Sequence, residues 1–210
     1  MRTAVFGGTF DPPHFGHRKL ALAVLESKRA DKILFVPAWH PPHKPGLVVA
    51  SFEERMEMLR LAIEGEHRFE ISDIEARRTL SPSYTSDTME ALEAERPGEE
   101  LLLLMGSDSL RQLHTWHRAG ELVARWPLLV YPRADEETSM GELSSKWPPE
   151  TARQLFSAVL SGAPVFPYAS TRLRDLLAAG KDPGDIIAPA VYLYIKARKL
   201  YLKGQSLPGQ

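Results

Sequence analysis

The residues best suited to chemistry lie between Gly7 and His17, in the segment GGTFDPPHFGH. Its two adjacent glycines allow backbone to approach a phosphate without a Cβ in the way. His14 and His17 are three residues apart in an expected first helical turn, so both rings can face one anion. A helix start also presents backbone N–H groups and a positive dipole end. The pattern predicts a phosphate site where two imidazoles stabilise charge that develops in a transition state.

Two other interpretations of these residues exist. The glycine pair can form a tight turn only, with the histidines capping and packing. His14 with His17, and His40 with His43, also have the H-x-x-H spacing of zinc ligands. The chain has no Cys, which excludes disulfides, thiolate zinc sites and thiol nucleophiles. The strand–turn–helix context favours the phosphate interpretation, and we expect no resident metal site.

Alternating apolar patterns indicate which elements position this segment. Runs typical of buried strands cover residues 3–6, 32–37, 69–73, 101–105, 128–131 and 165–166. Helical patterns cover residues 15–28, 52–63, 85–95, 151–160, 171–179 and 189–200, and a loop is expected from 132 to about 150. This order predicts one α/β domain over residues 1–210: a Rossmann-like, doubly wound, mostly parallel sheet with helices on both faces. Ligands of such sheets bind beyond the carboxyl ends of the strands, where the glycine turn lies.

Composition narrows the class of protein. The 210 residues include 26 basic and 27 acidic side chains, for a net charge of −1, so we expect no nucleic-acid polymer as partner. No apolar stretch reaches membrane-spanning length, and residues 1–6 are too short for a signal peptide. We therefore expect a cytoplasmic protein without membrane contact. The sequence leaves the oligomeric state open, a homo-oligomer included.

The glycine-rich segment resembles the signature of the HxGH nucleotidylyltransferases, and is most similar to that of the bacterial nicotinate-nucleotide adenylyltransferases. The resemblance implies that His14 and His17 bind ATP phosphates and stabilise the pentacoordinate transition state. It also implies ATP contacts from the turn residues Gly7, Gly8, Thr9 and Phe10. Phosphopantetheine adenylyltransferases, on the same scaffold, usually carry Thr where this chain has His14.

Two segments resemble the part of the family that binds the mononucleotide. Residues 41–44 (PPHK) place Lys44 on a loop stiffened by proline, where it can meet phosphate or remain a solvated lysine. Tyr84 and Thr85 begin a helix, and the resemblance implies that backbone there meets the pyridine carboxylate. A plain N-cap at Ser83 or Thr85 is the alternative.

Two further residues extend that resemblance. Trp116 matches a tryptophan that stacks on the nicotinate ring, although an indole is often only part of a core. Arg133 matches an arginine just after the fifth strand, but its neighbours Ala134 and Asp135 depart from the family's Pro-Gly. Both residues are therefore expected on the mononucleotide side.

Two segments resemble the ATP side. Gly106 and Asp108 follow the expected central strand and match a G-x-D segment assigned to the nucleotide, with a helix N-cap as the alternative for Asp108. The segment at residues 169–174 is similar to the family's I-S-S-T-x-I-R motif. Ser170 and Thr171 can cap the helix that begins there, and the resemblance implies ATP contacts from Ser170, Thr171 and Arg174.

This last segment also departs from the family. Tyr168-Ala169 replaces Ile-Ser, and Leu176 stands where a second arginine often follows. Arg172 is a candidate replacement for that arginine.

Together these segments imply adenylyl transfer from ATP to nicotinate mononucleotide, giving nicotinate adenine dinucleotide and pyrophosphate for NAD biosynthesis. The positive field would come from His14, His17, Lys44 and Arg174, with Mg²⁺ as cofactor held mainly by the phosphates. The expected partners are ATP and a pyridine mononucleotide. The alternatives are another acceptor (nicotinamide mononucleotide or phosphopantetheine), a nucleotide-binding sensor without chemistry, and a zinc hydrolase using four histidines. The sequence assigns no role to residues 134–164.

Overall fold

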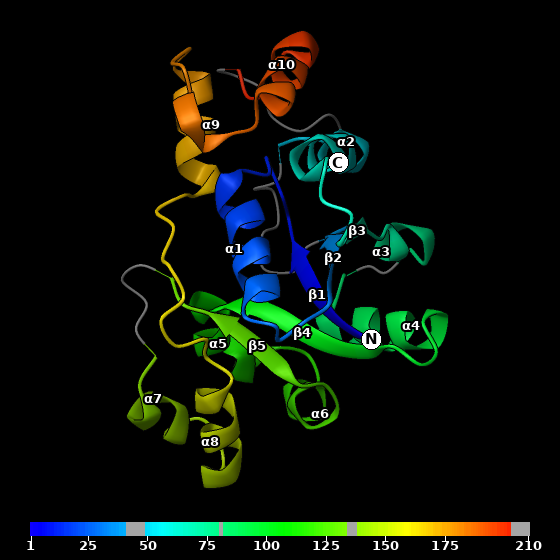
Figure 1. Ribbon diagram of the computed structural model, residues 1–210, viewed down its shortest axis with the longest axis vertical. Helices are drawn as coiled ribbons and strands as arrows, with labels where there is room; N and C mark the ends of the chain where they lie inside the picture. The colour runs from blue at the N-terminus through cyan, green and yellow to red at the C-terminus, as the bar shows by residue number, and fades with distance from the viewer. Residues whose placement is uncertain (41–48, 80–81, 134–137, 203–210) are drawn as a thin grey trace.

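A single parallel sheet organises the chain, whose computed structural model describes residues 1–40, 49–79, 82–133 and 138–202. Its strand order is β3-β2-β1-β4-β5 (Figure 1). The strands are β1 (Arg2–Gly8), β2 (Lys32–Pro37), β3 (Phe69–Ile71), β4 (Glu100–Gly106) and β5 (Leu128–Tyr131). Every pairing is parallel, so the predicted Rossmann-like α/β fold is confirmed.

The two faces of the sheet are both buried, which explains the unbroken apolar runs. Alternate residues of the central strands point to opposite faces, with Ala4 and Phe6 in one core cluster and Val5 in the other. The first face packs on α1 (Phe15–Glu26) and α2 (Phe52–Ile63). The other is covered by α3 (Ile74–Arg77), α4 (Thr85–Glu95), α5 (Ser107–Gln112), α6 (Ala119–Arg125), α7 (Met140–Ser144) and α8 (Pro149–Ser157). Helices on both faces were predicted, and this is confirmed.

A third cluster lies beside α2, at the top of Figure 1. Here α9 (Ser170–Ala178) and α10 (Pro189–Arg198) pack with Met58 of α2. Two short 3₁₀ helices, Leu113–Thr115 and Gly184–Ile186, complete the described elements. None of the helices within the described ranges is long and apolar enough to cross a membrane.

Two sequence predictions about connecting segments were wrong. Residues 165–166 form no strand, because Val165 is exposed and β5 is bordered instead by a single bridge between Val130 and Val159. The expected loop from 132 to 150 contains α7, which begins where the Ser139 hydroxyl accepts a hydrogen bond from the Glu142 amide at 3.1 Å. Residues 139–142 have the S-x-x-E spacing of a capping box, which could have predicted this helix start.

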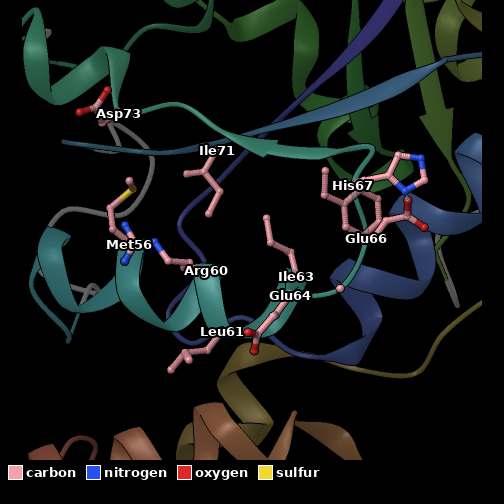
Figure 2. A pocket seen from close by; sticks show the side chains of 11 residues that line it. Met56, Arg60, Leu61, Ile63, Glu64, Glu66, His67, Ile71 and Asp73 are labelled. Atoms are coloured by element: carbon pink, nitrogen blue, oxygen red, sulfur yellow. Dashed lines mark ion pairs between the residues drawn. The ribbon is translucent and has the colours of Figure 1, made fainter.

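A groove of about 830 Å³ borders the edge strand β3 (Figure 2). Its lining includes Met56 and Arg60 of α2, together with Ile71 of β3. It contains none of the residues predicted to bind substrate.

Candidate active site

The predicted phosphate segment lies where the strand order reverses. Strand β1 pairs with β2 on one side and with β4 on the other. After β1 the chain enters α1 on one face of the sheet, and after β4 it enters α5 on the opposite face. In open α/β sheets, ligands bind at the carboxyl ends of the strands where the connections diverge in this way.

The two histidines form a stacked pair at the start of α1. His14 is the N-cap residue, and its backbone N–H donates to Nδ1 of His17 at 3.1 Å. The ring centroids are 3.8 Å apart with an interplanar angle of 24°. Because His17 Nδ1 accepts a hydrogen bond, a neutral His17 ring carries its proton on Nε2. Both rings therefore form one unit, as the helical spacing predicts.

His14 is a neutral ring in this setting. It is 5 % exposed. Burial, and next the positive charge of Arg133, lower the pKa of His14 from 6.5 to about 3. A neutral imidazole still offers one N–H to a phosphate oxygen. A neutral His14 ring can therefore donate one hydrogen bond but adds no positive charge, which differs from the cationic role expected of it.

Glycine occupies the positions of this segment for different structural reasons. A Cβ on Gly8 would lie 2.9 Å from the Phe10 ring, and one on Gly16 would lie 2.8 Å from the His14 ring. Gly7 is exposed with open space around it. The Phe10 side chain is buried, in a left-handed backbone conformation, 5.0 Å from the His17 ring centroid. Phe10 therefore has only its backbone to offer a nucleotide, while its ring supports His17.

The start of α9 docks on the same segment, although about 160 residues separate them along the chain. The Ser170 hydroxyl donates to the Pro12 carbonyl at 3.0 Å, and Arg174 Nη1 donates to the Asp11 carbonyl at 2.7 Å. Arg174 Nη2 also lies 3.3 Å from Thr171 Oγ1.

The helix cap there differs from the prediction. Ser170 and Thr171 were expected to cap α9, but the N-cap is Ala169, which makes no side-chain hydrogen bond. The Ser170 hydroxyl is engaged with Pro12 instead. The N-terminal turn of α9 thus presents backbone N–H groups beside the histidine pair without a side-chain cap.

Residues at the ends of β4 and β5 also come together. Asp108 Oδ1 and Arg133 Nε form an ion pair at 3.2 Å, and the Arg133 N–H donates to Ser107 Oγ at 2.9 Å. Gly106 is the N-cap of α5, so Asp108 lies inside the helix and the N-cap alternative for Asp108 is wrong. A Cβ on Gly106 would lie 2.3 Å from Asp108 Oδ1, so the pair requires a glycine there.

A narrow cleft of about 20 Å³ joins several of these groups. It is lined by His14 and His17 of α1, by Arg133 after β5, and by Tyr168 before α9. The Tyr168 ring centroid lies 6.3 Å from that of His14. The cleft therefore brings His14 and His17, predicted for the ATP side, beside Arg133, which was predicted for the mononucleotide side.

Three of the residues expected on the mononucleotide side, Tyr84, Thr85 and Trp116, lie on the other face of the sheet. Tyr84 is the N-cap of α4, and its ring stacks on His117 with centroids 4.3 Å apart. Trp116 is half-buried and packs against the core cluster under α4. The N-cap alternatives for Ser83 and Thr85 are wrong, since the Ser83 hydroxyl accepts a hydrogen bond from the His40 amide at 2.9 Å.

The described residues do not include every predicted site residue, and they also bear on the question of a metal site. Lys44 and His43 lie outside the described residues, so their places in the site stay predictions. Within the described part of the chain, no group of three or more His, Asp or Glu side chains could hold a metal ion.

Three buried charged residues near the site were not predicted from the sequence. Asp11 accepts hydrogen bonds from the amides of Val49 and Ala50 at 2.7 and 3.1 Å. Arg55 and Glu75 are also buried, below the loop that follows β2. The signal for Arg55 was its position on the apolar stripe of α2, where a charged residue is unusual.

Comparison with known proteins agrees with this geometry. The cytidylyltransferase-like family matches residues 5–176. The probable nicotinate-nucleotide adenylyltransferase of Gloeobacter violaceus is 40% identical over 207 residues, covering 95% of this chain and 96% of that protein. The corresponding protein of Caldicellulosiruptor bescii is 36% identical over 205 residues, covering 96% and 99%.

Solved structures share the fold. Plasmodium falciparum nicotinic acid mononucleotide adenylyltransferase complexed with NaAD superposes with a TM-score of 0.74 at 19% identity, covering 95% of this chain and 97% of that one. A putative nicotinate-nucleotide adenylyltransferase from Vibrio parahaemolyticus gives a TM-score of 0.67 at 21% identity, covering 98% of both chains. By its sequence and its fold, this chain belongs to the nicotinate-nucleotide adenylyltransferases, a branch of the cytidylyltransferase-like family.

Proposed function

We propose that this chain joins nicotinate mononucleotide to the adenylyl group of ATP, forming nicotinate adenine dinucleotide and pyrophosphate. The observation that carries the proposal is the stacked pair His14–His17, set beside Arg174 and the uncapped start of α9 at the carboxyl ends of β1 and β4. Such a concentration of N–H donors suits a triphosphate and the charge that grows on it during transfer.

The reaction needs no general base. An oxygen of the mononucleotide 5′-phosphate, already an anion, attacks the α-phosphorus of ATP in line. The bond between that phosphorus and the oxygen bridging to the β-phosphate breaks, and pyrophosphate leaves with the electron pair. The protein then has to align the two substrates and stabilise charge on the phosphoryl oxygens.

The donor residues divide this work by charge. His14 supplies a neutral N–H, because burial keeps its pKa near 3. His17 presents its Nε2 side, since Nδ1 accepts the His14 amide. Arg174 brings a positive guanidinium, anchored by the Asp11 carbonyl. Lys44 adds a second cation by the family resemblance alone.

Magnesium enters this scheme as part of the substrate. The described residues offer no carboxylate cage, and Asp108 is already paired with Arg133 at 3.2 Å. Mg²⁺ commonly keeps several waters and binds phosphate oxygens, where it neutralises negative charge. We therefore assign it to the ATP phosphates.

The mononucleotide is proposed to bind at the start of α4. No side chain caps the start of α4, so the backbone N–H groups of its first turn suit a pyridine carboxylate, and the indole of Trp116 provides a surface for the ring. The Tyr84–His117 stack widens this aromatic surface.

A pyrophosphate-release assay tests the proposal. ATP and Mg²⁺ are supplied with nicotinate mononucleotide, nicotinamide mononucleotide or phosphopantetheine in parallel. We expect turnover with the nicotinate compound well above turnover with the other two. Preference for another acceptor contradicts the roles given to Tyr84 and Trp116. No release with any acceptor, from folded protein that binds ATP, contradicts the reaction itself.

A further inference from the structure

Three consecutive residues after β2, Ala38 to His40, are held by buried polar groups from three different helices or their flanks. They have no regular secondary structure, so their peptide groups need other hydrogen-bond partners. Arg55 of α2, Glu75 of α3 and Ser83 before α4 supply these partners. None of the three was predicted to take part in the reaction.

Arg55 joins the ends of the two neighbouring strands β1 and β2. Its Nη1 donates to the Thr9 carbonyl and its Nη2 to the Ala38 carbonyl, both at 2.8 Å. Arg55 is 2 % exposed, and its guanidinium lies 5.4 Å from the Phe52 ring centroid. Thr9 belongs to the phosphate-binding turn. A planar fork with two donors thus fixes the distance between that turn and the segment after β2.

Glu75 joins the same segment to the acceptor helix. Its Oε2 accepts the Trp39 N–H at 2.9 Å, and its Oε1 accepts the Thr88 hydroxyl of α4 at 2.8 Å. Glu75 is 6 % exposed. Immediately beyond, the His40 N–H donates to Ser83 Oγ at 2.9 Å, and the Ser83 N–H donates to the His40 carbonyl at 3.0 Å.

These contacts form a continuous connection. It runs from Thr9 through Arg55 to Ala38, along the backbone to Trp39, and through Glu75 to α4. One end is the turn that faces ATP, and the other is the helix whose first residues face the mononucleotide. Charged side chains at such depth are rare in proteins, and hydrophobic residues would fill the same space at lower cost.

We propose that Arg55 and Glu75 are positioning residues that hold the phosphate-binding turn and the acceptor helix α4 in register for in-line attack. The inference rests on the proposed function, since it assigns ATP to one end and the mononucleotide to the other. Neither residue touches substrate in this scheme. Their effect is on alignment, where a displacement of about 1 Å costs on the order of a hundredfold in rate.

Conservative substitutions test the proposal. Arg55→Lys keeps a charge but loses the fork, so one amine must replace two fixed donors. We expect kcat for pyrophosphate release to fall about tenfold or more, with the KM for ATP changed less than threefold. Glu75→Ala is expected to act in the same direction. Glu75→Gln keeps an acceptor for Trp39 and a partner for Thr88, so it is expected to retain most of the turnover.

The matched control is Arg18→Lys. Arg18 also donates to two carbonyl groups, those of Ala62 and Glu64, but at the far end of α2. This variant is expected to lose stability without losing turnover. The proposal is overturned if folded Arg55→Lys has the wild-type turnover, as Arg18→Lys is expected to have. It is also overturned if Glu75→Gln loses as much turnover as Glu75→Ala. Inactivity of the wild type with every acceptor contradicts the proposed function instead.

Amide hydrogen exchange tests, in the absence of substrate, whether the two ends of this connection are coupled. If Arg55 and Glu75 couple the two ends, Arg55→Lys raises exchange at residues 82–90 as well as at residues 36–40, although Arg55 contacts neither Tyr84 nor Thr88 in the hydrogen bonds described above. Arg18→Lys leaves both segments protected. Increased exchange confined to residues 36–40 in Arg55→Lys overturns the coupling, whatever the activity of the chain.

Discussion

The region proposed to bind ATP (the ATP side) and the region proposed to bind the mononucleotide (the mononucleotide side) are held in place by different kinds of contact. On the ATP side, the segment around Asp11 is hydrogen-bonded to α9, to residues 49–50 and to Tyr201. On the mononucleotide side, the Tyr84 ring lies on an exposed His117, at the start of a helix that no side chain caps. The first side is anchored at depth by distant parts of the chain, and the second is presented near the surface.

This difference matches the chemistry asked of each side. Charge stabilisation at a phosphorus requires donors that do not reorganise during the reaction, and buried hydrogen bonds provide that rigidity. Recognition of an acceptor ring requires mainly surface and a few polar contacts. Relatives on this scaffold can therefore keep one side while the other changes with the acceptor.

Asp11→Asn is expected to have the largest effect, because it disrupts the hydrogen bonds that anchor the ATP side. The carboxylate accepts three hydrogen bonds, including one from the Tyr201 hydroxyl at 2.6 Å, and an amide places a donor against at least one of those donors. We expect the free energy of unfolding to fall by about 3–5 kcal/mol, measured by urea denaturation. Asp31→Asn, at an exposed pair with Arg2, is the control and should lose far less. Equal losses in the two variants contradict the anchoring role.

His17→Ala breaks the chemistry on the ATP side without removing the anchor. Loss of one donor to developing charge typically costs about a hundredfold or more in turnover. We expect that loss in kcat for pyrophosphate release, with folding unchanged by circular dichroism. His67→Ala, an exposed histidine at the β3 groove, is the control and should keep wild-type turnover. Normal turnover in His17→Ala rules out the role assigned to this ring.

The pH dependence of stability tests whether His14 is neutral. The unfolded chain takes up a proton on this ring near pH 6.5, whereas the folded chain does so near pH 3. Between these values the unfolded state binds more protons, so acid favours unfolding. From pH 7 to pH 5 the contribution of His14 to the free energy of unfolding falls by about 2 kcal/mol.

Comparison with His14→Gln isolates this contribution from the other titrating groups. The glutamine does not titrate, so the wild type should lose stability more steeply than the variant over that pH range. Denaturant unfolding at half-unit pH steps provides the measurement. Parallel curves for the two proteins would falsify a buried neutral His14.

Much of the ATP side was predictable because its information is local in the sequence. His14 and His17 are separated by one helical turn, and the glycines sit between a strand and that helix. The family resemblance added Arg174, and the structure placed it on the Asp11 carbonyl. The parallel sheet and the two-sided helical cover were likewise predictable, because strand and helix patterns alternate along the sequence.

What escaped prediction depends on contacts between distant segments. Asp11 is within the recognised motif, yet its partners Val49, Ala50 and Tyr201 are fixed only by the tertiary fold. Helix caps were misjudged for the same reason, because the Ser83 hydroxyl had a better partner in the His40 amide. The sequence does not predict with which of two backbone groups a single hydroxyl will form a hydrogen bond.

The smallest expected effect separates two interpretations of Trp116 on the mononucleotide side. Stacking on an aromatic ring is worth about 0.5–1.5 kcal/mol, so Trp116→Ala should raise the KM for nicotinate mononucleotide about three- to tenfold while the KM for ATP stays within twofold. Trp147 is the matched control, because it packs half-buried against the same core cluster from a different segment. Both substitutions should lower stability, since each removes an indole from that cluster. If Trp147→Ala shifts the KM as much as Trp116→Ala does, the indole of Trp116 acts only as core. A shift in Trp116→Ala alone places the nicotinate ring beside Tyr84, on the more exposed side of the site.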